Sequence, residues 1–256
     1  MPVFPGTNCE FETAHAFKNG NVKTINFNNY NKQIIEESIF QFSQQILQSQ
    51  ILVFSGGFSA GDEPNGSAKY IVNVLQNEKV KNSINEFLQK GGLILGICNG
   101  FQALIKSGLL PYGKVTNLNK TSPTLTHNEV GRHVSQMVQI KVVNDASPWL
   151  QNMKDKIYTV PVSHGEGRFF AVEETIQDLI NKNQIATQYV DEDLQPTNIF
   201  PYNPNGSIYA IEGLISEDGN IFGRMAHPER VKTNRLKNIP NLEYQDIFYN
   251  GINYFL

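Results

Sequence analysis

The chain has 256 residues, a formal net charge of −3 and 40% hydrophobic residues. This length is enough for one large domain with a sizeable core, and the acidic balance argues against a nucleic-acid-binding protein. No apolar run approaches membrane-spanning length, and the first residues are neither a secretory signal nor a transit segment. Because two cysteines do not make a disulfide framework, we expect a cytoplasmic protein.

Strand and helix patterns alternate in the first half of the chain. Short apolar runs indicate buried strands, and apolar residues at helical spacing indicate helices. In chain order we expect a strand remnant at 3–4, a helix over 10–18 with Asn8 as its candidate cap, a strand over 23–27, a helix over 34–47, a strand over 51–54, helices over 67–75 and 80–88 with a break near Asn77, and a strand over 93–97. This alternation predicts a parallel sheet with helices on both faces. Ligands would then bind at the carboxyl ends of the strands, where the glycine-rich loops fall.

The segment Gly96-Ile97-Cys98-Asn99-Gly100 carries the clearest chemical signal. It joins the apolar run at 93–95 to a predicted helix over 101–106. A nucleophile between glycines at a strand-to-helix turn is typical of a nucleophile elbow, and the helix N-terminus there favours a thiolate. A cysteine after an apolar strand is usually a small buried hydrophobe. Strand, turn and helix nevertheless follow in the order that a catalytic thiol needs, so we interpret Cys98 as a nucleophile.

Strand patterns dominate the second half of the chain. Extended segments are expected at 134–142, 157–162, 185–190, 208–213 and 221–226, followed by a closing helix within 244–255. Residues 191–205 are polar and contain three prolines, which predicts a loop, and 125–132 is a second polar loop. Internal repeats and domain boundaries are not evident, so we expect residues 1–256 to form a single domain.

A thiol nucleophile needs a base, and the base needs an orienting group. His227 follows the last predicted strand, and Glu229 stands two residues further on. One ring nitrogen of His227 could face Cys98 while the other bonds Glu229, with the proline between them stiffening the segment. A polar surface loop would have the same composition. His164 could be a second base, but Glu229 favours His227, and we interpret His164 and Glu166 as pocket or interface residues.

Taken together, these segments resemble the class I glutamine amidotransferases. The nucleophile segment at 96–102 and the histidine segment at 227–230 carry this resemblance. Three further segments, at 4–10, 55–62 and 163–169, resemble the glutaminase of phosphoribosylformylglycinamidine synthase. The resemblance covers the whole chain. It implies a three-layer, flavodoxin-like α/β fold with a mostly parallel central sheet.

The resemblance also implies hydrolysis of the side-chain amide of glutamine. Cys98 would attack the amide carbon, His227 would transfer the proton, and Glu229 would fix the imidazole tautomer. The tetrahedral oxyanion needs two preorganised donors, for which we expect the backbone N–H groups of Gly57 and Asn99. Substrate contacts are expected from Gly56, Phe58, Gln102, His164, Gly165 and Gly167.

Other polar residues give weaker signals. Gln102 lies one helical turn beyond the nucleophile, so it either contacts the substrate or lies on a helix surface. Arg168 either binds a ligand carboxylate or pairs on the surface with Glu166 or Glu173. Cys9 is expected to be a structural cysteine buried near the first loop.

No cofactor is expected in this chain. A Walker-type loop is lacking, and His127 and His133 have no partners at metal-ligand spacing. The resemblance implies that the ammonia goes to a synthetase domain or subunit, which uses ATP and magnesium to convert formylglycinamide ribonucleotide to the amidine in purine synthesis. The expected partners are therefore glutamine and this synthetase, with neither nucleic acid nor membrane.

Two alternatives remain open at this point. The chain could be a related thiol hydrolase or a glutaminase that serves another synthetase. It could also be a non-catalytic domain that only docks onto a partner. The presence of Cys98, His227 and Glu229 together makes the non-catalytic alternative the weaker one.

The first strand is unusually short for a central strand. Only Val3 and Phe4 lie between Pro2 and the turn at Pro5-Gly6. A central parallel strand typically has about five residues. We therefore expect the chain to be the C-terminal part of a larger synthetase rather than a free-standing subunit.

Overall fold

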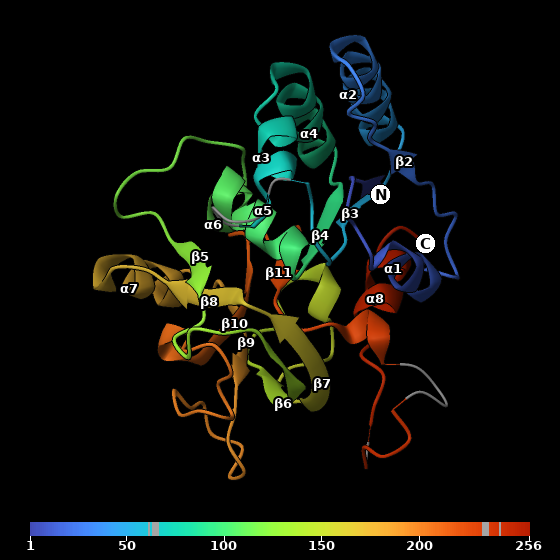
Figure 1. The fold of residues 1–256 in the computed structure, drawn as a ribbon. Coiled ribbons are helices and arrows are strands. Elements are labelled where there is room, and N and C mark those ends of the chain that lie inside the picture. Colours follow the sequence, from blue (N-terminus) through green and yellow to red (C-terminus); the bar gives the residue numbers. More distant parts are fainter. Residues whose placement is uncertain (61, 63–66, 232–235, 241) are drawn as a thin grey trace.

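The computed structural model describes residues 1–60, 62, 67–231, 236–240 and 242–256 (Figure 1). Its centre is a seven-stranded sheet with the strand order β3-β4-β11-β10-β9-β6-β7. These strands are β3 (Ile51–Phe54), β4 (Leu93–Ile97), β6 (Val134–Val142), β7 (Ile157–His164), β9 (Ile185–Tyr189), β10 (Ile211–Ile215) and β11 (Ile221–Arg224). Two small sheets accompany it, one of β1 (Pro2–Val3) with β2 (Ile25–Asn26), the other of β5 (Thr124–His127) with β8 (Glu166–Phe170).

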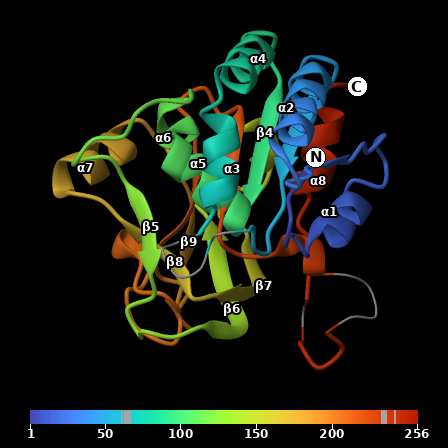
Figure 2. The same ribbon diagram turned by 45° about the horizontal axis from the view of Figure 1, so that its top comes forward.

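Helices lie on both sides of the first strands of the sheet. They are α1 (Glu10–Ala16), α2 (Lys32–Leu47), α3 (Lys69–Leu75), α4 (Glu78–Gln89), α5 (Asn99–Ser107), α6 (Leu109–Tyr112), α7 (Glu173–Asn181) and α8 (Ile247–Asn253). Both ribbon views place α3 and α5 to one side of β4, and α1 and α8 to the other (Figures 1 and 2). Within the described residues, no helix is long and apolar enough to cross a membrane.

The expected α/β fold is confirmed, but the sheet differs from the mostly parallel one that we predicted. Parallel pairing is restricted to β3 with β4 and β4 with β11. The other four neighbouring pairs are antiparallel. Parallel strands need a long crossover, whereas β10 and β11 are separated only by residues 216–220 and so form a hairpin.

Most expected elements are present, with shifted ends. The strands at 51–54 and 93–97 match β3 and β4, and the expected break near Asn77 is the start of α4, where the Asn77 side chain accepts the N–H of Lys79 at 3.0 Å. Asn8 is not a cap, because α1 begins after Cys9 without a side-chain cap. The expected loop at 125–132 contains most of β5, and α7 and β8 were not anticipated.

The short first strand lies outside the central sheet. β1 pairs in parallel with β2, with Pro2 opposite Ile25 and Val3 opposite Asn26. Its two residues are therefore not those of a shortened central strand, contrary to our expectation. The expectation that the chain belongs to a larger synthetase stays a prediction.

Candidate active site

Cys98 lies at a sharp turn between β4 and α5, as predicted. Its backbone has φ 51° and ψ −106°, a region that non-glycine residues seldom adopt and that clusters at functional sites. Its N–H donates to the carbonyl of Arg224 at 2.8 Å, and its Sγ lies 3.9 Å from the carbonyl oxygen of Ser163. The thiol is thus presented at the carboxyl end of β4 on a well-anchored backbone.

Glycine allows α5 to begin directly against the sheet. A Cβ on Gly100 would lie 2.0 Å from the carbonyl oxygen of Phe54 in β3. A Cβ on Gly96 would lie 2.9 Å from the backbone carbonyl carbon and oxygen of Gly100. Because backbone atoms cannot give way by this much, the glycines on both sides of Cys98 are needed for the close packing of strand, turn and helix.

His227 and Glu229 form a buried pair just after β11. Nδ1 of His227 lies 2.6 Å from Oε1 of Glu229, and the 3₁₀ turn Pro228–Arg230 holds the carboxylate in place. The backbone N–H of His227 donates to the carbonyl of Pro161 at 2.9 Å. Bonding of Nδ1 to Glu229 leaves Nε2 as the free ring nitrogen. Glu229 and the carbonyl of Pro161 thus fix the position of His227.

The charges around His227 determine its protonation. Burial lowers the pKa of its imidazole, but the Glu229 carboxylate and then Cys98 raise it, and the net pKa is well above the usual value. An imidazole with a raised pKa carries a proton at neutral pH. His227 can therefore stabilise negative charge that forms beside it and can deliver a proton to a leaving group.

The two expected oxyanion donors belong to segments that one carboxylate ties together. Asp62 is buried, and its side chain accepts the N–H of Ser59 at 2.6 Å and the Ser59 hydroxyl at 2.8 Å. It also accepts from the side-chain amide of Asn99 at 3.3 Å. Gly57 has φ +103°, and a Cβ there would lie 2.4 Å from Oδ1 of Asn8. The glycine loop and the start of α5 are therefore held in a fixed relation.

The sequence Asp62-Glu63-Pro64 is typical of a turn, but residues 63–66 lie outside the described ones. The assignment of Gly57 and Asn99 as oxyanion donors stays a prediction.

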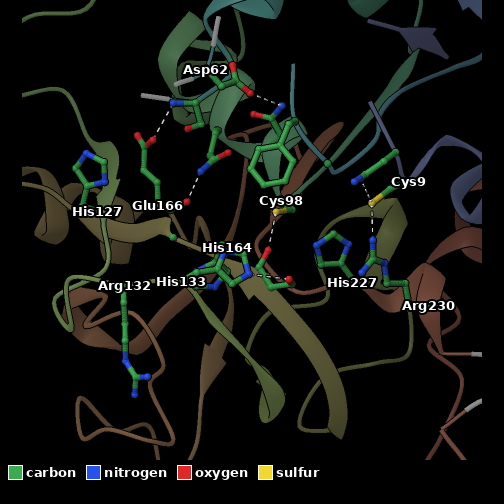
Figure 3. Close-up of a pocket in the computed structure, with 18 of the residues that line it drawn as sticks. Cys9, Asp62, Cys98, His127, Arg132, His133, His164, Glu166, His227 and Arg230 are labelled. Atoms are coloured by element: carbon green, nitrogen blue, oxygen red, sulfur yellow. Dashed lines mark hydrogen bonds between the residues drawn. The ribbon is translucent and has the colours of Figure 1, made fainter. Parts of the chain in front are cut away.

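A pocket of about 600 Å³ opens beside Cys98 (Figure 3). This volume suits a small-molecule ligand. The expected site residues on its wall are Gly57, Phe58, Cys98, Asn99, Gln102, His164, Gly165 and His227. Gly56 and Gly167 lie behind this wall, because a Cβ on Gly56 would lie 2.6 Å from Cε1 of His227 and a Cβ on Gly167 would lie 2.8 Å from Nδ1 of His164. These two glycines therefore make room for the side chains of His227 and His164.

Gln102 faces the pocket and not the helix surface. It is buried, and its Nε2 donates to the carbonyl of Glu166. The Glu166 carboxylate in turn lies 2.8 Å from Nζ of Lys106 and accepts the N–H of Ser67 at 2.8 Å. Burial raises the pKa of Glu166, but Lys106 and Ser67 outweigh this effect and the net pKa is lowered. This ionised network fixes one end of the pocket.

His164 is neutral and differs in this from His227. The side-chain nitrogen of Asn128 donates to the carbonyls of Arg132 and His164 at 3.0 and 2.8 Å, so its oxygen faces Nδ1 of His164, 3.1 Å away. Nδ1 then carries the hydrogen, and the buried Nε2 has no partner among the described residues. Burial, followed by the charges of His227 and His133, lowers the pKa of His164 to about 3. His164 is thus poorly suited to be the base.

Cys9 lies beside the triad, which the sequence alone did not indicate. Its Sγ accepts from Nη2 of Arg230 at 2.9 Å, and donor atoms of Cys9, His227 and Glu229 all lie within 4.8 Å of one another. These donor types bind zinc in other proteins. Here one oxygen of the Glu229 carboxylate is bonded to His227 and the thiol to Arg230, so each of the three side chains already has a protein partner.

Arg168 has neither of the acidic partners that we considered. It donates to the carbonyl of Gly206 at 3.1 Å and lies 3.8 Å from the carboxylate of Glu129. Because both contacts are to groups of the protein itself, the position of Arg168 does not indicate that it binds a ligand carboxylate.

Comparisons with known proteins agree with this geometry. A family model described as a CobB/CobQ-like glutamine amidotransferase domain matches residues 1–255. The phosphoribosylformylglycinamidine synthase subunit PurQ of Methanococcus maripaludis strain S2 is 35% identical over 94% of this chain and 83% of that protein. The PurQ subunit of Campylobacter jejuni is 36% identical over 89% of this chain and 84% of that protein.

A solved structure shows the same fold. The superposition on a chain of PurLQS from Thermotoga maritima covers 100% of this chain and 97% of that chain, with a TM-score of 0.69 and 24% identity. The match of the family model and the identity to the curated subunits lead to one conclusion. The chain belongs to the CobB/CobQ-like glutamine amidotransferases and, within them, to the PurQ family of phosphoribosylformylglycinamidine synthase subunits.

Proposed function

We propose that the chain hydrolyses glutamine to glutamate and ammonia and supplies the ammonia to a synthetase that makes formylglycinamidine ribonucleotide in purine biosynthesis. The observation that carries this proposal is the arrangement of Cys98 beside the His227–Glu229 pair, whose Nδ1 and Oε1 atoms are 2.6 Å apart. A thiol, an imidazole and a carboxylate in this order are the groups that acyl transfer by a thiol needs. Membership in the PurQ family supports the identity of the substrate and of the pathway.

The reaction proceeds through a glutamyl thioester. The Cys98 sulfur attacks the side-chain amide carbon, and the carbonyl oxygen becomes an oxyanion. As this intermediate collapses, the carbon–nitrogen bond breaks and His227 gives its proton to the nitrogen, which leaves as ammonia. His227 then takes a proton from water, which attacks the thioester and releases glutamate and Cys98. Glu229 holds the imidazole tautomer and stabilises the imidazolium throughout.

Backbone and side-chain groups around the thiol bind the substrate in this proposal. The N–H groups of Gly57 and Asn99 stabilise the oxyanion, which in other enzymes contributes about 10²–10³-fold to turnover for each donor. Gln102 uses its Nε2 on the carbonyl of Glu166, so its Oε1 is left to accept from glutamine. Phe58, His164 and Gly165 form the remaining walls of the pocket.

The synthetase step belongs to a partner. ATP and magnesium bind on that partner, which is either a separate subunit or another domain of the same polypeptide. In Thermotoga maritima, a chain of this fold occurs in the structure of PurLQS. An ammonia-producing site of this kind is useful only when a consuming site receives the ammonia.

Glutamate release from glutamine, measured with and without the synthetase of the same organism, tests the proposal. We expect glutamate release that Cys98→Ala abolishes, and formylglycinamidine ribonucleotide formation that free ammonia restores in this variant. Glutamate release that only a different synthetase stimulates would assign the chain to another pathway. Equal glutamine-dependent synthesis by the wild type and Cys98→Ala would make the chain a docking domain.

A further inference from the structure

A fully buried ion pair lies beneath the proposed triad. Arg224 ends β11 and Glu212 lies in the neighbouring strand β10, and both side chains are 0% exposed. Nη2 of Arg224 lies 3.2 Å from Oε2 of Glu212, and its Nε donates to Oε1 at 3.3 Å. A buried ion pair gives little net stability, because removing both charges from water costs about as much as their attraction returns. Net stability therefore does not explain why this ion pair is buried here, and its contacts indicate another role.

The pair binds the backbone on both sides of the reaction centre. The carbonyl of Arg224 accepts the N–H of Cys98 at 2.8 Å. Oε1 of Glu212 accepts the N–H of Ala226, the residue before His227, at 2.7 Å. The thiol segment is thus joined to the backbone of Arg224, and the segment that carries the imidazole is anchored by the Glu212 side chain, which Arg224 holds in place.

The neighbouring residues leave the pair little freedom. Oε2 of Glu212 also accepts the hydroxyl of Thr187 at 2.5 Å, and Nη1 of Arg224 donates to the side chain of Gln245. A Cβ on Gly213, the residue after Glu212 in β10, would lie 2.6 Å from Oγ1 of Thr187 and 3.1 Å from Cβ of Arg224. The side chains are therefore fixed by close packing as well as by hydrogen bonds.

We propose that Glu212 and Arg224 are positioning residues that set the placement of Cys98 relative to His227. This inference rests on the proposed function of the triad. Neither side chain is on the wall of the pocket, so the pair acts through the hydrogen bond from the Ala226 N–H to Glu212, next to His227. A displacement of about 1 Å at a reacting group can cost about 10²-fold in rate. Loss of the pair should therefore lower kcat and leave KM nearly unchanged.

Two substitutions of Glu212 separate its charge from its hydrogen bonds. Glu212→Leu removes the acceptor of the Ala226 N–H, whereas Glu212→Gln keeps an oxygen there. With the synthetase present, we expect Glu212→Leu to lower kcat for glutamine about 10²-fold, with KM within about threefold of the wild type. Glu212→Gln should recover most of this loss. A rise in KM with unchanged kcat would contradict a positioning role.

A double variant separates positioning from folding. Glu212→Leu alone leaves the charge of Arg224 buried without its carboxylate, whereas Glu212→Leu with Arg224→Met removes both charges and should fold as stably as the wild type. We expect this double variant to regain the melting temperature but not kcat. Recovery of kcat together with the melting temperature would overturn the proposal.

A second measurement needs neither glutamine nor the synthetase. The rate at which iodoacetamide alkylates Cys98 is followed against pH by peptide mapping of the isolated chain. We expect Glu212→Leu and the double variant to shift this profile, whereas Ile84→Ala, in the core beside α2 and far from the triad, should lower the melting temperature and leave the profile in place. Unshifted profiles in the Glu212 variants would overturn the inference. Absence of glutaminase activity in the wild type would instead contradict the proposed function, and the two failures are thus distinct.

Discussion

Gly56 lies against the imidazole of His227, so closely that a Cβ at this position would be 2.6 Å from Cε1. The same Cβ would lie 3.3 Å from Cβ of Cys98. The lack of a side chain at Gly56 is what allows thiol and imidazole to approach each other. The glycine loop therefore contributes to catalysis by its shape, in addition to any donor that it provides.

Gly56→Ala should inactivate the enzyme with a smaller effect on folding. The added methyl group pushes the His227 ring away from Cys98, and we expect kcat for glutamine to fall about 10²-fold or more. Gly20→Ala is the matched control, because a Cβ there has no neighbour closer than 3.5 Å among the described residues. Wild-type kcat in Gly56→Ala would show that the ring has another route to the thiol.

Glu229→Gln should impair turnover much more than stability. Gln keeps the size of the side chain but removes the charge that raises the pKa of His227, so this pKa should fall toward its usual value. We expect kcat to fall by about 10²–10⁴-fold, as for other triads with a neutral orienting group. Steady-state kinetics and thermal unfolding test this together. A large drop in melting temperature at nearly unchanged kcat would assign Glu229 a structural role only.

His164 should make the protein sensitive to acid. Its pKa is lowered from 6.5 to about 3 in the folded state, so below the unfolded value the unfolded chain binds a proton that the folded chain does not. The contribution of neutral His164 to the free energy of unfolding is thus fully present above pH 6.5. It is lost as the pH falls toward 3, by about 1.4 kcal/mol per pH unit.

Urea unfolding between neutral pH and about pH 4.5 measures this effect. The acid limb is the fall in the free energy of unfolding as the pH decreases. We expect its slope in His164→Asn to be smaller than in the wild type by the equivalent of about one proton. His15→Asn, at an exposed position of α1, is the control and should keep the wild-type limb. Identical limbs in all three proteins would mean that His164 is protonated in the folded state.

Local patterns predicted the parts of the molecule that depend on neighbours in the chain. The apolar runs predicted β3 and β4 at their observed ends, and the glycine spacing predicted the turn at Cys98. The sequence also placed Glu229 next to His227, because only Pro228 separates them along the chain.

Features that depend on distant segments were not predictable in this way. The antiparallel order of the later strands and the pairing of β5 with β8 arise from tertiary contacts. Cys9 lies next to the triad because Arg230, 221 residues away, binds its sulfur. The ring of His164 is held by Asn128, which lies 36 residues before it. Sequence periodicity contains no information on such pairings.

The central claim is that Cys98 is the nucleophile, and covalent labelling tests it most directly. A glutamine analogue with an electrophilic ketone in place of the amide is incubated with the chain and its synthetase, and the labelled peptides are mapped by mass spectrometry. We predict stoichiometric label on Cys98, protection by glutamine, and no label in Cys98→Ala. Cys9 is the internal control, because it lies beside the same triad but is bonded to Arg230. Label on Cys9 alone, with Cys98 unmodified, would contradict the account.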